Sequence, residues 1–280
     1  MWTWLTEPLS YSFIPRALAV GAVTSIIAGV LSCWLILIGW SLLGDAVSHA
    51  VLPGVVISYM FGMPYAVGAL VAALVAVGLV GTVKERTTLK SDTSIGVVFT
   101  ALFALGLVLV SRTPASTNLQ EILFGNLLGV TQASLIQVFS FGLIALALML
   151  FFRRDITLWA FDAGHARAVG IHTTALRWVV MVCLALVVVA SMQAVGVILV
   201  VAMLITPGAI AYLLTRKMNR MLLISPAIAF VCSAVGIWAS FWLNVSAGGM
   251  IILVQALVFL VVYLFAPREG LITTALRERA

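Results

Sequence analysis

The stretch "WVVMVCLALVVVASMQAVGVILVVAMLITPGAIAYLLT" (residues 178–215) contains no charged side chain. A transmembrane α-helix needs about 20 apolar residues, so this run is too long for a single crossing. The residues "QAVG" (193–196) stand near its middle, and a polar residue followed by a glycine favours a turn there. The run therefore predicts two membrane-spanning helices joined by a short turn.

The rest of the chain repeats this pattern. Two other uncharged runs are also too long for one crossing, and they contain turn-forming residues at "FGMPY" (61–65) and "NVSAGG" (244–249). Of the 280 residues, 64% are hydrophobic and 9% are charged, and the mean hydropathy is +1.23. A backbone in hydrocarbon must satisfy its hydrogen bonds internally, which helices do. The sequence predicts an all-α, polytopic helical membrane protein, with residues 1–280 forming one transmembrane domain.

Charges and helix breakers divide the chain into about nine candidate spans. The expected spans are 17–39, 41–61, 64–83, 93–111, 131–151, 175–193, 195–215, 221–243 and 249–266. Eight spans with a re-entrant segment at 40–62 is the alternative. The segment "PASTNLQEILFGNLLGV" (114–130) is too polar at its start and too short to cross. We expect it to be an external loop that leads into a partial helix lying against the bundle.

The basic residues indicate how the chain is oriented in the membrane. Of the 15 lysines and arginines, 13 lie in the loop 84–90, the region 153–177, the turn 216–220 and the tail from Pro267. Nine spans place all four regions on one side, and cytoplasmic loops carry an excess of lysine and arginine. The sequence therefore predicts an external N-terminus, a cytoplasmic C-terminus and a long cytoplasmic loop at 153–177.

Several other functions and features are not expected. The net charge of +6 comes from short loops between spans, so these residues are topology signals and not a nucleic-acid surface. Cys33, Cys183 and Cys232 are isolated in apolar runs, which does not fit a disulfide framework or a thiolate metal site. The N-terminus lacks a basic leader, so a cleavable signal peptide is not expected.

The stretch "GDAVSHAVLPG" (44–54) places an aspartate and a histidine inside an expected span. Asp45 and His49 are four residues apart, which puts both side chains on one face of a helix. An ionisable group within a membrane marks a pathway or a site, and carboxylate with imidazole suits a first-row divalent metal ion. A proton relay and a hydrogen-bonded pair that only fixes helix packing are the alternatives. Two ligands are too few for a complete metal site.

Prolines follow this pair and recur in a later span. Pro53 and Gly54 are expected to interrupt the helix and to free backbone carbonyls near the pair, as broken helices do in transporters. The residues "TPG" (206–208) have the same potential, although a simple kink at Pro207 is the more economical interpretation.

The expected cytoplasmic loop contains "FDAGHARAVGIHT", from Phe161 to Thr173. Its small residues and the glycine Gly170 predict a short helix over 161–170 that ends at this glycine. Such a helix can insert into a groove on another protein, or it is only a loop helix. The neighbouring histidines are flanked by arginines, so we do not expect them to bind a cation.

No motif for catalysis is visible. The chain has no GxxxxGKS/T phosphate-binding loop, no HExxH metalloprotease motif and no GxSxG nucleophile motif. The sequence therefore predicts that this chain is not an enzyme and that it does not hydrolyse a nucleotide with a phosphate-binding loop of its own.

The combination of these features resembles the ABC-3 family, the membrane permease subunits of ATP-binding-cassette importers for manganese, iron and zinc. The matching stretches occur in the family's order and extend over about residues 15–266. They are "GDAVSHAVLPGVVISYMFG" (44–62), "ERTTLKSDTSIGVVFTALFALGLVLVS" (85–111), "EILFGNLLGV" (121–130), "FDAGHARAVGI" (161–171) and "QAVGVILVVAMLITPGAIAYLL" (193–214). The first stretch is the most specific.

The resemblance implies a permease dimer, homomeric or heteromeric, in the cytoplasmic membrane of a bacterium. It implies cytoplasmic ABC ATPase subunits and an extracytoplasmic metal-binding protein as partners, with manganese, iron or zinc as the substrate and no permanently bound cofactor. Asp45 and His49 match the family's metal-handling pair. The ATPase-coupling helix is matched by Phe161, Asp162, Ala163, Ala166 and Gly170.

Two other classes of function remain as alternatives. A proton-coupled secondary transporter would use Asp45 and His49 as a relay and would transport without an ATPase. An intramembrane enzyme would need a nucleophile or a fuller metal site, which the sequence does not contain. The sequence does not choose among manganese, iron and zinc, because affinity order alone does not set selectivity.

Overall fold

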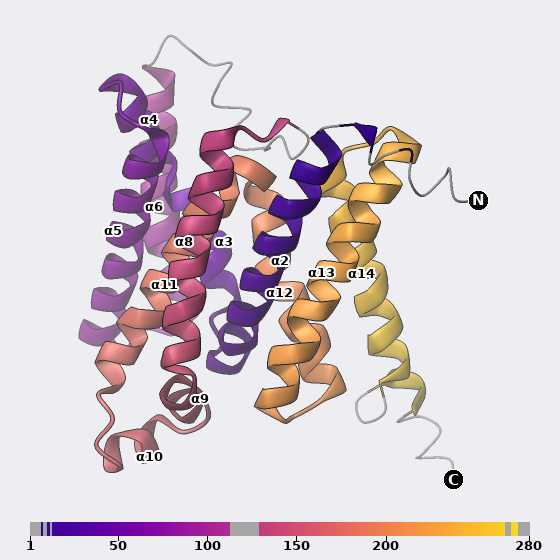
Figure 1. Ribbon diagram of the computed structural model, residues 1–280. Coiled ribbons are helices and arrows are strands. Elements are labelled where there is room, and N and C mark those ends of the chain that lie inside the picture. The colour runs from indigo at the N-terminus through magenta and orange to yellow at the C-terminus, as the bar shows by residue number, and fades with distance from the viewer. Residues whose placement is uncertain (1–6, 8–9, 12, 113–128, 267–269, 274–280) are drawn as a thin grey trace.

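The structure is a computed structural model, and it describes residues 7, 10–11, 13–112, 129–266 and 270–273. Within these ranges it is a bundle of helices without strands (Figure 1). Nine helices in the described part of the chain are long and apolar enough to cross a bilayer. The predicted all-α membrane fold and its nine spans are confirmed. The expected partial helix at 114–130 lies almost entirely outside the described residues.

The helices follow one another with short connections. The membrane-spanning helices are α2 (Phe13–Ile38), α3 (Ser41–Ala50) with α4 (Leu52–Met60), α5 (Tyr65–Arg86), α6 (Ser91–Ser111), α8 (Gln132–Phe151), α11 (Thr173–Val195), α12 (Val197–Leu214), α13 (Met218–Leu243) and α14 (Ala247–Phe265). Two short helices, α9 (Arg153–Phe161) and α10 (Ala163–Ala168), lie between α8 and α11 at one end of the bundle (Figure 1).

The α3–α4 segment crosses as one unit. Only Val51 separates the two helices, and its backbone stays in the right-handed helical region (φ −74°, ψ −17°). The combined helix Ser41–Met60 has 20 residues, enough for a full crossing. The expected interruption is therefore a one-residue junction just before Pro53, and the re-entrant alternative is not needed.

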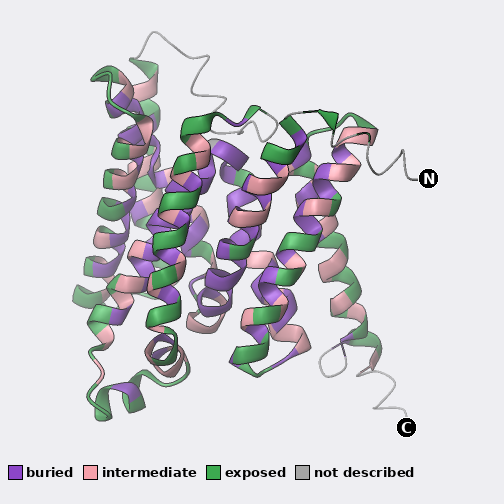
Figure 2. Ribbon diagram, in the orientation of Figure 1, coloured by how far each residue is buried: buried purple, intermediate pink, exposed green. Residues whose placement is uncertain are grey.

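The α3–α4 segment, α2 and α11 form the centre of the bundle. In the most apolar stretch of α3–α4, 72% of the residues are buried, and the figure is 67% for both α2 and α11, whereas it is 11% for α14. Figure 2 shows this contrast, with buried residues concentrated on the inner helices and exposed ones on the outer helices. Exposed leucine and valine side chains on the outer helices fit a surface that faces lipid tails.

Small residues allow two helix pairs to approach closely. A Cβ atom added at Gly54 of α4 would overlap the carbonyl oxygen of Gly68 in α5, and the reverse is also true. In α12, the backbone N–H of Gly208 donates to the hydroxyl of Ser32 in α2 at 3.0 Å. That hydroxyl donates to the carbonyl of Ile205 at 3.3 Å. Close backbone contact through small residues is the usual way in which membrane helices pack.

The residues 206–208 therefore have a packing role. Pro207 lies inside α12, which continues from Val197 to Leu214 without a break. The alternative of unwinding at this position is not observed, and the hydroxyl of Ser32 bonds the backbone groups of Ile205 and Gly208 on either side of the proline. The simpler interpretation, a proline within a packed helix, is the one that the structure supports.

Candidate functional site

Asp45 and His49 lie one turn apart on α3 and face the same direction. The Nε2 atom of His49 is 3.5 Å from the Oδ1 atom of Asp45. This distance exceeds the 2.7–3.2 Å that is typical of hydrogen bonds with a nitrogen donor, so the two groups do not satisfy each other tightly. The side chain of His49 is 30% exposed and that of Asp45 is 43% exposed. Both retain room to bind something outside this chain.

The helix that carries the pair is otherwise firmly packed. Leu43, Val47 and Ala50 are buried on the opposite side. A Cβ atom added at Gly44 would lie 3.0 Å from Leu204 of α12, so α3 and α12 are in close contact. Burial of one face fixes how the helix is rotated and thereby fixes the direction in which the acid and the imidazole point.

The aromatic rings of α6 form one wall beside the pair. The ring centroid of His49 is 5.7 Å from that of Phe99 and 5.5 Å from that of Phe103. These rings limit the orientation of the imidazole and exclude water from one side of it. The sequence did not indicate this contact, because the phenylalanines are about 50 residues away along the chain.

The described part of the chain does not contain a complete metal site. Among the described residues, no group of three or more histidine, cysteine, aspartate or glutamate side chains gathers where it could hold a metal ion. A first-row divalent ion takes four or more ligands. The pair can therefore supply only part of a metal site, and the remaining ligands must come from a second chain, from water or from residues outside the described ranges.

The pair lies near the end of the bundle that carries α9 and α10. Trp40, the residue directly before α3, packs against Trp159 of α9 at that end. Asp45 lies four residues after Ser41, the first residue of α3, which corresponds to about 6 Å along a helix. His49 lies one turn further toward the other end of the bundle.

The loop 153–177 contains two helices instead of the single one expected. Phe161 is the last residue of α9, and α10 begins at Ala163. Asp162 separates them with an extended backbone, and its carboxylate accepts hydrogen bonds from the N–H groups of Gly164 and His165, both at 2.9 Å. The backbone hydrogen bond from His165 is the main cause that lowers the pKa of Asp162. An ionised aspartate is a favourable N-cap, and this cap explains why a new helix starts here.

The expected end of the short helix is confirmed. Gly170 has φ +88°, a conformation that glycine adopts readily, and its N–H donates to the carbonyl of Arg167. Ala166 is fully buried, so this residue attaches α10 to the rest of the chain. Phe161, at 59% exposure, and Val169, at 60%, form the apolar part of the surface that remains open.

The helix α9 connects this loop to α3. Trp159 of α9 packs against Trp40, the residue directly before α3, with the ring centroids 5.7 Å apart in an edge-on arrangement. The indole N–H of Trp34 donates to the hydroxyl of Thr157 at 3.1 Å. Sequence reasoning missed α9, although Ile156 and Trp159, three residues apart and both buried, are the signal of a short amphipathic helix.

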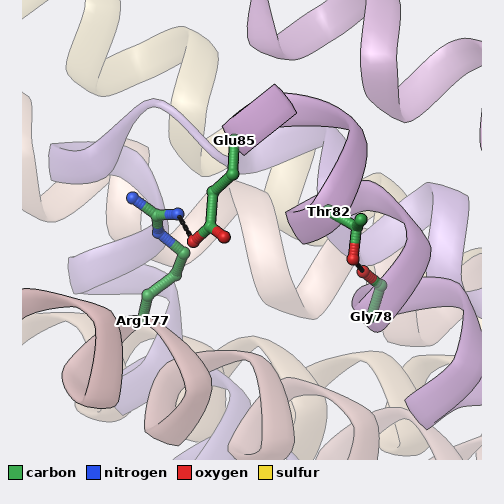
Figure 3. Close-up of polar contacts among 4 residues, drawn as sticks. All are labelled: Gly78, Thr82, Glu85 and Arg177. Carbon is green, nitrogen blue, oxygen red and sulfur yellow. Dashed lines mark hydrogen bonds and ion pairs between the residues drawn. The ribbon is translucent and has the colours of Figure 1, made fainter. Parts of the chain in front are cut away.

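An ion pair joins α11 to α5 at the same end of the bundle. Figure 3 shows the guanidinium of Arg177 directed at the carboxylate of Glu85, with Nη1 and Oε1 2.5 Å apart. On α5, the hydroxyl of Thr82 donates to the carbonyl of Gly78 at 2.8 Å. The ion pair connects the start of α11, just after the α9–α10 segment, with the end of α5.

Comparison with known proteins places the chain among membrane transport components. The profile of the ABC 3 transport family matches residues 10–266. The manganese transport system membrane protein MntB of Synechocystis is 43% identical over 279 residues, covering 100% of this chain and 91% of that protein. The chelated iron transport system membrane protein YfeD of Yersinia pestis is 41% identical, with 93% of this chain and 88% of that protein covered.

A solved structure has the same fold. The PsaBC assembly of Streptococcus pneumoniae, determined in complex with Fab, matches with a TM-score of 0.87 and 36% sequence identity. The match covers 99% of this chain and 99% of the compared chain. The fold is therefore shared with the compared chain over almost the whole length of both.

Proposed function

The chain belongs to the ABC 3 transport family, and from this membership we propose that it is the transmembrane permease subunit of an importer for divalent transition-metal ions. It is a multi-pass protein of the bacterial cytoplasmic membrane. The observation that carries the proposal is the Asp45–His49 pair, which opens outward from a buried helix of a family permease. Manganese, iron and zinc are the candidate ions, and the names of the relatives favour manganese and iron.

A dimer would complete the site. Two copies of the pair, one from each permease, would offer a cation two carboxylates and two imidazoles at the contact between the chains. The partner would be a second copy or a related permease. An ion in transit needs ligands that release it again, and a site shared between two chains can be opened by moving the chains apart.

The energy source in this proposal is a separate ABC ATPase. The helix α10 would be the docking contact, since it lies beyond the ends of the spans and keeps most of its surface exposed. The packing of Trp159 on Trp40 would transmit movement of this region to α3. An extracytoplasmic metal-binding protein would deliver the ion at the opposite end of the bundle.

Reconstituted transport tests the function directly. In proteoliposomes that contain the permease, the ATPase and the binding protein, we expect uptake of manganese, iron(II) or zinc that requires ATP. Omission of the ATPase should stop uptake. Uptake that continues without the ATPase and disappears when the proton gradient is dissipated would instead identify a proton-coupled secondary transporter.

The predicted orientation can be tested with single cysteines. Cys33, Cys183 and Cys232 are buried, so the native background is low. We expect Val245→Cys, between α13 and α14, to react with a membrane-impermeant maleimide in intact spheroplasts. Val169→Cys, after α10, should react only when the membrane is permeabilised, because it lies on the basic side. Reaction of both in intact cells, or of Val169→Cys alone, would contradict the orientation.

The docking role of α10 predicts a second result. Ala168→Arg places a long charged side chain on the exposed surface of α10, and we expect it to reduce copurification of the ATPase at least about tenfold, a typical interface effect. Ala133→Arg makes the same change at the exposed start of α8, at the opposite end, and should leave copurification unchanged. Equal copurification in both variants would remove the docking assignment.

A further inference from the structure

A cavity of about 420 Å³ lies between α9 and the first turns of α13. Arg153 and Arg154 line it from α9, and Asn219 lines it from α13. Its apolar walls include Leu158, Phe161 and Leu222. The cavity therefore combines two permanent positive charges and an amide with an apolar surface.

The two arginines keep their charge available. Within the described residues, the ion pairs are His49 with Asp45 and Arg177 with Glu85, and no carboxylate pairs with Arg153 or Arg154. Lys217 and Arg220, in the turn before α13 and at its start, add positive charge nearby without lining the cavity. Guanidinium groups bind phosphate oxygens in a two-pronged geometry, which makes arginine a preferred phosphate ligand.

The cavity lies at the level of lipid headgroups. The span α8 ends at Phe151, two residues before Arg153, and the span α13 begins at Met218, directly before Asn219. Phe151 is 80% exposed and Leu223 is 74% exposed, as expected for side chains that contact lipid tails. A ligand here would meet positive charge in the headgroup layer and apolar side chains beside it.

We propose that this cavity binds the phosphate group of an anionic phospholipid from the cytoplasmic leaflet. Basic pockets between membrane helices on the cytoplasmic side bind such headgroups. Arg153 and Arg154 bind the phosphate oxygens, the amide of Asn219 donates a hydrogen bond, and Leu158 and Leu222 contact the start of the acyl chains. The bound lipid joins α9 to α13, and the proposal does not depend on which metal is transported.

Native mass spectrometry of the full-length protein tests this proposal. The protein is released from nanodiscs that contain phosphatidylglycerol and phosphatidylcholine, and the retained lipid is identified. We expect preferential retention of phosphatidylglycerol. The double variant R153Q/R154Q should retain it about thirtyfold less, which corresponds to about 1 kcal/mol for each arginine. The variant K217Q/R220Q removes the same charge outside the cavity and should retain it within about threefold of wild type.

Two further measurements separate the proposal from its competitors. Asn219→Asp adds a negative charge to the cavity without changing its size, and it should also reduce phosphatidylglycerol retention. Inorganic phosphate at millimolar concentration should not displace the lipid, because phosphate alone lacks the apolar contacts. The proposal fails if R153Q/R154Q retains phosphatidylglycerol normally or if K217Q/R220Q loses it equally. It also fails if free phosphate displaces the lipid. If R153Q/R154Q retains the lipid normally but no longer copurifies with the ATPase, the cavity binds an acidic protein surface and the proposal is wrong.

Discussion

Asp45→Asn and His49→Ala are each expected to reduce metal uptake by about a hundredfold or more, while the permease still reaches the membrane. Loss of even an indirect partner of a metal ligand lowers affinity by about 10–100-fold, and these residues would be direct ligands. Neither side chain is buried, so its replacement leaves no large cavity and no unpaired buried charge. Uptake of radioactive manganese by cells that express the complete transporter is the measurement, with membrane protein quantified by immunoblot.

The double variant distinguishes a shared site from two separate effects. If Asp45 and His49 hold the same ion, the double change should reduce uptake little more than either single change. The effects of substitutions within one site are not additive. Asp92→Asn, the same chemical change at an exposed position in the first turn of α6, should transport normally. Normal uptake by well-expressed Asp45→Asn and His49→Ala would show that the pair is structural.

Gly68→Ala is expected to destabilise the permease strongly although it adds one methyl group. The new Cβ atom would overlap the carbonyl oxygen of Gly54 and the hydroxyl of Ser58, and a backbone atom cannot move aside as a side chain can. Overpacking of this kind costs about 1–3 kcal/mol and sometimes more. The fraction of monodisperse protein after heating, measured by fluorescence-detected size exclusion, should fall well below that of wild type.

Gly78→Ala is the matched control on the same helix. Its Cβ atom would meet only the ring of Trp178, at 3.6 Å, which is an ordinary contact. Alanine also favours helix more than glycine does, so this variant should be as stable as wild type or slightly more stable. If Gly68→Ala and Gly78→Ala lose monodisperse protein at the same temperature, the close approach of α4 and α5 does not limit stability.

The number and order of the spans could be predicted from sequence because hydrocarbon imposes a simple rule on length and polarity. Two expected limits stop at a charged residue and leave the helix too short. The first expected span begins just after Arg16, yet α2 begins at Phe13. The third ends just before Lys84, yet α5 continues to Arg86. Helices extend beyond the hydrocarbon into the headgroup layer, where charges are tolerated, so charge marks the membrane boundary and not the helix end.

The candidate site was predictable only in part. The i, i+4 spacing placed Asp45 and His49 on one face, and the structure has them there. The contacts of His49 with Phe99 and Phe103 depend on how α3 and α6 pack, which no local pattern encodes. Ala166 was expected at a partner surface, but its small size is used to pack α10 against this chain. An alanine can lie at a partner surface or pack inside its own chain, and only the tertiary structure distinguishes these two roles.

The position of Asp45 close to the start of α3 has an electrical consequence. In the proposed orientation, a cation from outside crosses most of the roughly 30 Å hydrocarbon layer before it reaches the pair. A membrane potential that is negative inside contributes about 2.3 kcal/mol per elementary charge for each 100 mV, and about twice that for a divalent ion. Most of this voltage drop would act on the ion on its way to the pair, and little would act on its release into the cytoplasm. The resting potential of the cell would therefore raise the occupancy of the site, and release would depend on the conformational change.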